Sequence, residues 1–227
     1  GVAAVTTNVN DLAAMGAWPL ALVDTVTGPR EVIRRVLEGM RWASGLYDVP
    51  VVGGHMTVTE GPPGLSAFGL GRADFPLSAQ AAASGQSLML GCCLDGQMRS
   101  DFPFFPSFDE RGTKLAGDVR LLAEGAESGW VAAAKDVSMA GLVGSLAMLL
   151  ECNRLGVSLD LDALPVPAGV TVERWVTCFP CLSFLLCVPA GREEDCLHAF
   201  GLRGLAAATV GTLDDTGLLR IASAGRT

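Results

Sequence analysis

The stretch between residues 8 and 20 places one acid, Asp11, among small apolar residues and ends at two helix breakers, Gly16 and Pro19. Gly adopts the left-handed conformation that terminates helices, and Pro lacks the amide hydrogen needed to continue one. We therefore expect a short helix through Met15 with its alanines packed inward. An acid in such a segment needs a partner, because burying an unpaired carboxylate is costly.

Two explanations of Asp11 stay open at this point. Asn8 and Asn10 are candidate helix caps, and a carboxylate at a helix start is stabilised by the free amide groups and the helix dipole. The other explanation is a metal site, since Mg²⁺ takes carboxylate oxygens and leaves its remaining positions to water and phosphate.

Composition narrows the class of protein. The chain has 227 residues, of which 50% are hydrophobic and 18% charged, so it can bury a large core as a compact α/β or α+β protein. Its net charge of −8, with Lys114 and Lys135 as its two lysines, argues against a nucleic-acid partner. A small anionic ligand remains possible, because backbone amides and a bridging cation can hold phosphates.

The cysteines and the hydropathy of the sequence indicate where in the cell the protein is expected. Seven cysteines lie scattered in apolar contexts, which is typical of reduced core thiols in a cytoplasmic protein. No uninterrupted apolar run is long enough for a membrane span, so we expect no membrane partner. The chain begins without Met inside an apolar run, and we expect that an upstream segment has been removed or is absent.

Hydrophobic periodicity predicts two α/β units. In the first, the expected order is helix, strand, helix, strand, strand, with the elements after the first helix at residues 20–26, 30–46, 49–52 and 65–72. Pro76 and a run of small polar residues mark a change of unit, so we place the domains at residues 1–80 and 81–227. In the second, we expect strands at 87–94, 182–188, 206–211 and 218–221 and helices at 117–124, 139–155 and 193–200.

A phenylalanine-rich segment interrupts the second unit. Residues 102–108 contain four phenylalanines and two prolines, a composition typical of a loop. The segment either plugs a core or dimer edge or forms a lid that faces substrate.

Further candidates for chemistry lie elsewhere. Gly53 and Gly54 follow an expected buried strand, and their lack of a side chain lets another backbone or a ligand approach closely. Thr57 adds a hydroxyl to this candidate site. The alternative is that the two glycines form a plain turn. Asp136, expected at the head of a long helix, is either a cap or, with Lys135 beside it, a contact for a phosphate and its metal.

Three other patterns suggest functional sites, each with less support from the sequence. His55 is a candidate structural histidine. Cys178 and Cys181 allow a redox pair or a zinc site, although core packing is the simpler interpretation. Asp24 and Glu60 allow the acid and base of a hydrolase that uses no nucleotide, while the P-loop and nucleophile-elbow motifs are absent from the sequence.

Three segments together resemble one superfamily. They are VNDLAAMGAWPL (residues 9–20, with LVD at 22–24 and TG at 27–28 behind it), VVGGHMT (51–57) and KDVSMAGL (135–142). They are similar to motifs of aminoimidazole ribonucleotide (AIR) synthetase and its PurM-like relatives thiamine-monophosphate kinase, selenophosphate synthetase and HypE. The chain is most similar to an AIR synthase-related group without a settled activity.

The resemblance implies a two-domain PurM-like fold, α+β in its first part and α/β in its second. The amino-terminal sheet, covered by helices, would dimerise as a barrel, and ATP with Mg²⁺ would lie near the dimer interface. On this resemblance Asp11 and Asp136 are metal ligands, and Gly53, Gly54, Thr57 and Lys135 join them around the nucleotide.

The implied activity is phosphoryl transfer or phosphate-activated ligation on a small molecule by a cytoplasmic homodimeric enzyme. The superfamily's upstream glycine- and aspartate-rich segment has no counterpart before Gly1, and His55 stands where some relatives carry an acid. The alternative is therefore a non-catalytic or regulatory dimeric binding protein of the same fold with an incomplete metal site.

Overall fold

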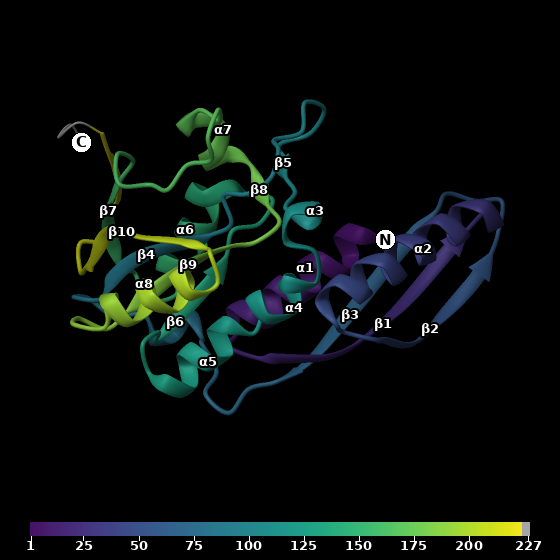
Figure 1. Cartoon of the computed structure of the whole chain (residues 1–227), viewed down its shortest axis with the longest axis horizontal. Coiled ribbons are helices and arrows are strands. Elements are labelled where there is room, and N and C mark those ends of the chain that lie inside the picture. Colours follow the sequence, from purple (N-terminus) through teal and green to yellow (C-terminus); the bar gives the residue numbers. More distant parts are fainter. Residues whose placement is uncertain (224–227) are drawn as a thin grey trace.

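The computed structural model describes residues 1–223. It contains two mixed sheets, one at each end of an elongated molecule (Figure 1). The first has three strands in the order β2-β1-β3, in which β1 pairs parallel with β2 and antiparallel with β3. Its elements are α1 (Val2–Ala14), β1 (Trp18–Gly28), α2 (Arg30–Tyr47), β2 (Val51–Val58) and β3 (Gly64–Arg72).

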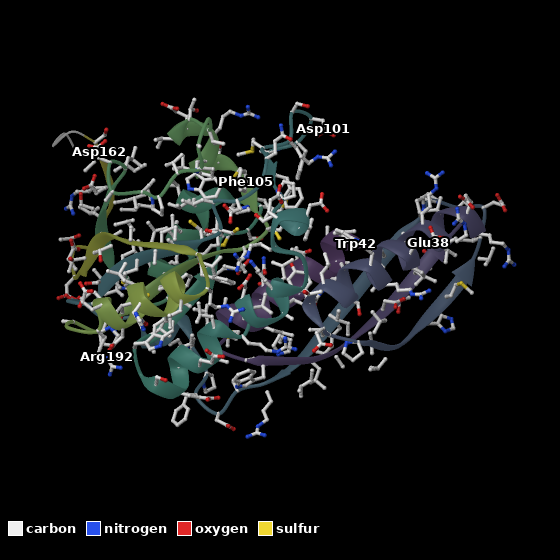
Figure 2. All side chains as sticks on the ribbon, viewed as in Figure 1. Glu38, Trp42, Asp101, Phe105, Asp162 and Arg192 are labelled. Atoms are coloured by element: carbon white, nitrogen blue, oxygen red, sulfur yellow. The ribbon has the colours of Figure 1, made fainter. Side chains whose placement is uncertain are left out.

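The helix α2 covers this sheet with one apolar face. Ile33, Met40 and Tyr47 are buried, whereas Glu38 projects into solvent (Figure 2) and pairs with Arg34. This is the amphipathic pattern expected for residues 30–46, and the observed helix confirms it within one residue at its end.

The opposite face of the three-stranded sheet is bare. Val23, Val52, Phe68 and Leu70 are 40%, 63%, 66% and 55% exposed. Together they border a shallow depression across β1, β2 and β3. We call these four residues the bare sheet face.

The second sheet has six strands in the order β11-β7-β10-β4-β9-β6. Its central strands β4 and β9 are buried along their whole length. The strands are β4 (Ser87–Cys92), β6 (Ala133–Asp136), β7 (Gly156–Asp160), β9 (Ser183–Val188), β10 (Ala206–Asp214) and β11 (Leu219–Ala222), and the short strands β5 (Phe104–Phe105) and β8 (Phe179–Pro180) pair beside them.

Helices cover both faces of the six-stranded sheet. Alternate residues of β4 enter different cores, Leu88 on the side of α6 and Met89 on the side of α1, α5 and α8, as the two-residue repeat of a strand requires. The helices are α5 (Leu121–Ser128), α6 (Gly141–Glu151), α7 (Val172–Thr177) and α8 (Glu193–Leu202), with the one-turn helices α3 (Phe108–Arg111) and α4 (Leu115–Asp118). Across residues 1–223, no helix is both long and apolar enough to cross a membrane.

The helix α1 packs against both sheets. Its residues Val5 and Val9 share a core with Phe184 of β9. On another side, Leu12 lies against Gly69 and Gly71 of β3, where an added Cβ would come within 3.1 Å and 3.0 Å of the Leu12 side chain. The two glycines therefore let α1 lie close to the sheet.

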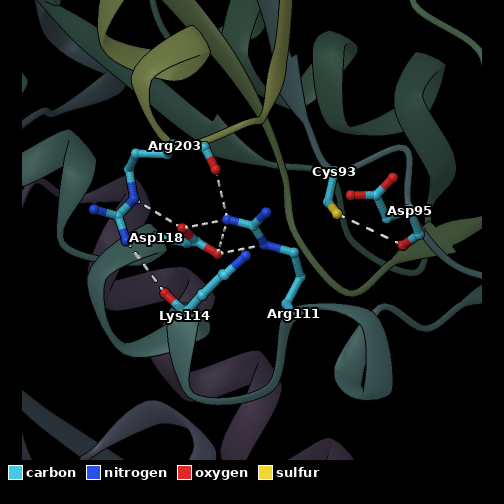
Figure 3. Close-up of polar contacts among 6 residues, drawn as sticks. All are labelled: Cys93, Asp95, Arg111, Lys114, Asp118 and Arg203. Carbon is cyan, nitrogen blue, oxygen red and sulfur yellow. Dashed lines mark hydrogen bonds and ion pairs between the residues drawn. The ribbon is translucent and has the colours of Figure 1, made fainter.

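A buried ion network ties α3 and α4 to the end of α8 (Figure 3). Arg111 donates two hydrogen bonds of 2.8 Å to the carboxylate of Asp118, and Arg203 donates a third of 2.8 Å. Arg111 also donates to the carbonyl of Arg203, and Arg203 donates to the carbonyl of Lys114. Every oxygen of this buried carboxylate thus has a guanidinium partner.

Several sequence predictions need correction. The first helix begins at Val2 and not near Asn8, because Asn8 donates its side chain to the carbonyl of Ala4 inside the helix and caps nothing. The expected helix at 139–155 begins at Gly141 and ends at Glu151, and the strands β6 and β7 and helix α7 were not foreseen. The short elements β6, β7 and α7 depend on the strands and helices that they pack against, and a periodic sequence pattern does not mark them.

Candidate functional site

Two acids and a lysine meet where α1 reaches the six-stranded sheet. Asp11 lies in the last turn of α1, and Asp136 is the final residue of β6, where it is 3% exposed. The two carboxyls are within hydrogen-bonding contact, and the ammonium group of Lys135 pairs with Asp136. We call these three residues the acid cluster.

The electrostatics of the acid cluster are unbalanced. Desolvation by the surrounding protein and, next, the Asp136 carboxylate raise the pKa of Asp11 to about 6, against the opposing effect of Lys135. Two carboxylates and one ammonium group leave one negative charge without a counterion. A proton or a metal cation at this position would relieve the repulsion.

The helix-cap interpretation of Asp11 is wrong. Asp11 is in the carboxy-terminal turn, where the helix dipole disfavours a negative charge. Asn10, the other candidate cap, is buried and donates a 2.9 Å hydrogen bond to the carbonyl of Cys181. Asp136 is likewise no helix cap, because β6 ends there and α6 begins at Gly141.

The acid cluster offers two carboxylates, which suits Mg²⁺ better than it suits a metal ion whose ligands are all protein side chains. Among residues 1–223, no group of three or more His, Cys, Asp and Glu side chains is arranged to hold a metal ion. Mg²⁺ commonly uses only one or two carboxylates and completes its shell with water and phosphate oxygens. Asp11 and Asp136 supply such a pair.

The predicted glycine motif lies elsewhere. Gly53, Gly54 and Thr57 fall inside β2, an exposed edge strand, and not in a turn after a buried strand. An added Cβ at Gly54 would stand 2.6 Å from the carbonyl oxygen of Asp24, so this glycine is required by strand pairing. Within residues 1–223 the structure brings together Asp11, Lys135 and Asp136 and leaves the β2 residues apart from them, since α1 packs on β3, the opposite edge.

The structure does not place Asp24 and Glu60 as the hydrolase alternative requires. Asp24 pairs with Gly54, and Glu60 lies beyond the Gly28–Val58 pair at the far end of the sheet. Four residues of strand put the Gly28–Val58 pair about 13 Å from the Asp24–Gly54 pair, and Glu60 lies two residues beyond Val58, too far for an acid and a base that act on one bond. His55 also lies on exposed β2, opposite Thr25.

The cysteine pair belongs to the core. Cys178 and Cys181 are both buried, and desolvation raises the pKa of each thiol to about 12. A redox or zinc-binding cysteine needs a thiolate near neutral pH, which a raised pKa opposes. Core packing, the simpler interpretation, is confirmed for both residues.

The phenylalanine-rich segment has two functions in the fold. Phe105 is 1% exposed and meets Trp175 edge to face at 5.2 Å, so it plugs a core as one alternative predicted. Phe102, Phe104 and Phe108 instead line a cavity of about 830 Å³, and Phe104 and Phe105 form the strand β5 where a loop was expected. The cavity could not be predicted from the sequence, because its walls come from five separate segments of the chain.

Comparison with known proteins shows the same two-part organisation. The profile described as AIR synthase related protein, N-terminal domain, matches residues 1–73, and that of the C-terminal domain matches residues 106–222. An uncharacterised protein of Synechocystis is 35% identical over 217 residues, which cover 94% of this chain and 67% of that protein. The chain spans 61% of the length of a second uncharacterised relative, from Methanocaldococcus jannaschii.

Solved structures share the fold. PurL of T. maritima complexed with ATP superposes with a TM-score of 0.80 at 19% identity, over 99% of this chain and 38% of that one. Thiamine-monophosphate kinase of Stenotrophomonas maltophilia gives a TM-score of 0.75 at 18% identity, over 99% and 78% of the two chains. With both domain profiles matched in order over most of its length, the chain belongs to the AIR synthase related family and has the two-domain PurM-like fold.

Proposed function

We propose that the acid cluster binds ATP through Mg²⁺ and that the protein catalyses phosphoryl transfer or phosphate-activated ligation on a small molecule. The observation that carries the proposal is the contact between Asp11 and Asp136, two carboxyls from different parts of the chain that share Lys135 as their counter-charge within the acid cluster. The fold it shares with an ATP-complexed PurL supports the nucleotide.

Each residue of the acid cluster has a definite task in this proposal. Asp11 and Asp136 would hold the metal, and Lys135 would turn from Asp136 to a phosphate oxygen once the metal neutralises that carboxylate. When bound, Mg²⁺ neutralises charge that develops on the transferring phosphoryl group. The chain itself contributes position and charge, the principal requirements of this chemistry.

We further propose a homodimer in which the bare sheet face of one copy packs on that of another as a barrel. Strands that expose large apolar side chains on one whole face are typical of an interface. Gly53, Gly54 and Thr57 would then line the nucleotide site from the edge of that interface. A domain boundary near residue 80 and a cytoplasmic location complete the proposal.

Binding of a non-hydrolysable ATP analogue tests the nucleotide site. We expect calorimetric titration to show binding that strengthens with Mg²⁺ and a loss of at least about tenfold in Asp11→Asn. Asp195→Asn, an exposed acid paired with Arg192 on α8, is the control and should match the wild type. Absence of Mg²⁺-dependent binding in the wild type would leave the binding-protein alternative.

A further inference from the structure

The cavity beside the phenylalanine-rich segment has the form of a ligand pocket. Its volume is about 830 Å³, within the usual range for small-molecule sites, and the amino-terminal half of α1 forms part of its wall. Figure 2 shows Trp42 on α2 beside this part of α1. We call it the ring cavity, and its aromatic and thioether walls are Trp42, Phe102, Phe104, Phe108, Met139 and Phe179.

The aromatic wall is preorganised. Trp42 meets Phe108 edge to face at 5.4 Å, Phe108 lies 6.1 Å from Phe104, and Phe104 stacks on Phe179 at 5.2 Å. Trp42 and Phe102 keep 46% and 43% of their surface exposed, so ring faces remain free. A fixed wall with free ring faces favours a flat aromatic guest, which stacks on it at little entropic cost.

The lining of the ring cavity comes within a few residues of the acid cluster on two segments. Thr7 lines the cavity, and Asp11 follows it by one helical turn on the same face of α1. On the facing segment, Met139 lines the cavity three residues after Asp136. A small molecule with its ring in the cavity would therefore direct its other end toward the two carboxyls.

The charge of the lining selects an uncharged ring. Arg99 is the basic residue on the wall, and its guanidinium is paired with Asp101 at 2.7 Å. The remaining lining side chains are apolar apart from Thr6 and Thr7, and Thr7 donates its hydroxyl within α1 to the carbonyl of Ala3. A charged ring would lose its hydration here without gaining a counterion.

We infer that the ring cavity holds an uncharged aromatic or heteroaromatic ring of the second substrate, whose oxygen or phosphate end reaches the acid cluster. The inference rests on the proposed function, because it places the acceptor of the phosphoryl group relative to Asp11 and Asp136. It names the substrate class: a small molecule with a flat apolar ring at one end and an oxygen nucleophile or phosphate at the other.

Two fluorescent probes test the inference on the whole chain. 1-Naphthol presents only the ring and hydroxyl, and 1-naphthyl phosphate imitates the phosphorylated product. We expect saturable binding of both in anisotropy titrations, with Mg²⁺ strengthening only the phosphate. Phe102→Ala, which removes one wall, and Ala3→Trp, which fills the cavity from an exposed position of α1, should each weaken both probes by about tenfold or more.

Matched variants separate the two ends of the ligand. Phe75→Ala removes a phenylalanine that is 59% exposed outside the cavity and should change neither affinity by more than about twofold. Asp11→Asn should weaken 1-naphthyl phosphate with Mg²⁺ by a larger factor than it weakens 1-naphthol. Circular dichroism and melting curves confirm that each variant is folded.

Four results would overturn the inference. These are no saturable binding of either probe, equal affinities in all variants, insensitivity of 1-naphthyl phosphate to Asp11→Asn, and displacement of 1-naphthol by the ATP analogue, which would assign the cavity to the nucleotide. If the ATP analogue binds and the ring probes do not, the inference alone fails. If the ring probes bind and the ATP analogue does not, the proposed nucleotide function fails.

Discussion

At the scale of single residues, Asp11 shows what can and what cannot be predicted from sequence. The resemblance of its motif predicts that Asp11 is a site residue, but that motif did not predict its place in the last turn of α1. Asn8 and Asn10 resemble helix caps in the sequence, but both lie within α1, where Asn8 donates to the carbonyl of Ala4 and Asn10 donates to a carbonyl 171 residues away. Contacts of such long range leave no local signal.

The raised pKa of Asp11 predicts a pH-dependent stability. Its native value of about 6 exceeds its ordinary 3.8, so the native state holds the proton more tightly. Stability should therefore fall as pH rises from about 4 to about 6 and stay low above that window. Because the carboxyl is partly exposed, we expect Asp11→Asn to gain only about 1 kcal/mol over the wild type at pH ~8, and nothing at pH ~4.

Urea unfolding in EDTA at several pH values measures this difference. A gain that is the same at pH ~4 and pH ~8 would contradict the repulsion between Asp11 and Asp136. Adding Mg²⁺ should stabilise the wild type more than the variant, because only the wild type offers both carboxylates.

The buried ion network makes a second prediction at this scale. Asp118→Asn leaves Arg111, whose side chain is 4% exposed, beside Arg203 without a counter-charge. We expect a loss of about 3–5 kcal/mol in the free energy of unfolding. Asp101→Asn, which breaks the exposed pair with Arg99, should change little in the same denaturant titration. Equal losses of unfolding free energy in the two variants would show that the buried network stabilises the protein no more than an exposed ion pair does.

At the scale of elements, periodicity was a good guide where an element has one buried face. The expected helices at 30–46 and 193–200 and strand at 65–72 are α2, α8 and β3, with ends within two residues. The pattern failed for β2, where strand pairing continues through Gly53 and Gly54, and Gly54 lies against Asp24 of β1. It also failed for β6, whose four residues depend on pairing with β9.

At the scale of the whole molecule, the bare sheet face predicts association. Wild-type protein should behave as a dimer in light scattering at micromolar concentration. Phe68→Asp puts a charge at the most exposed of its four side chains and should give a folded monomer. Leu202→Asp, at a position 75% exposed on α8, is the control and should stay dimeric. A monomeric wild type would argue against the barrel.

The double packing of α1 has a consequence for motion. Leu12 fixes one side of the helix to the glycines of β3, while Asn10 and Val9 fix other sides to the six-stranded half. Asp11 lies between Asn10 and Leu12, which make two of these attachments. A tilt of one half of the molecule against the other would therefore turn α1 and change the distance between Asp11 and Asp136, so a cation bound at the proposed site would respond to the relative orientation of the two halves.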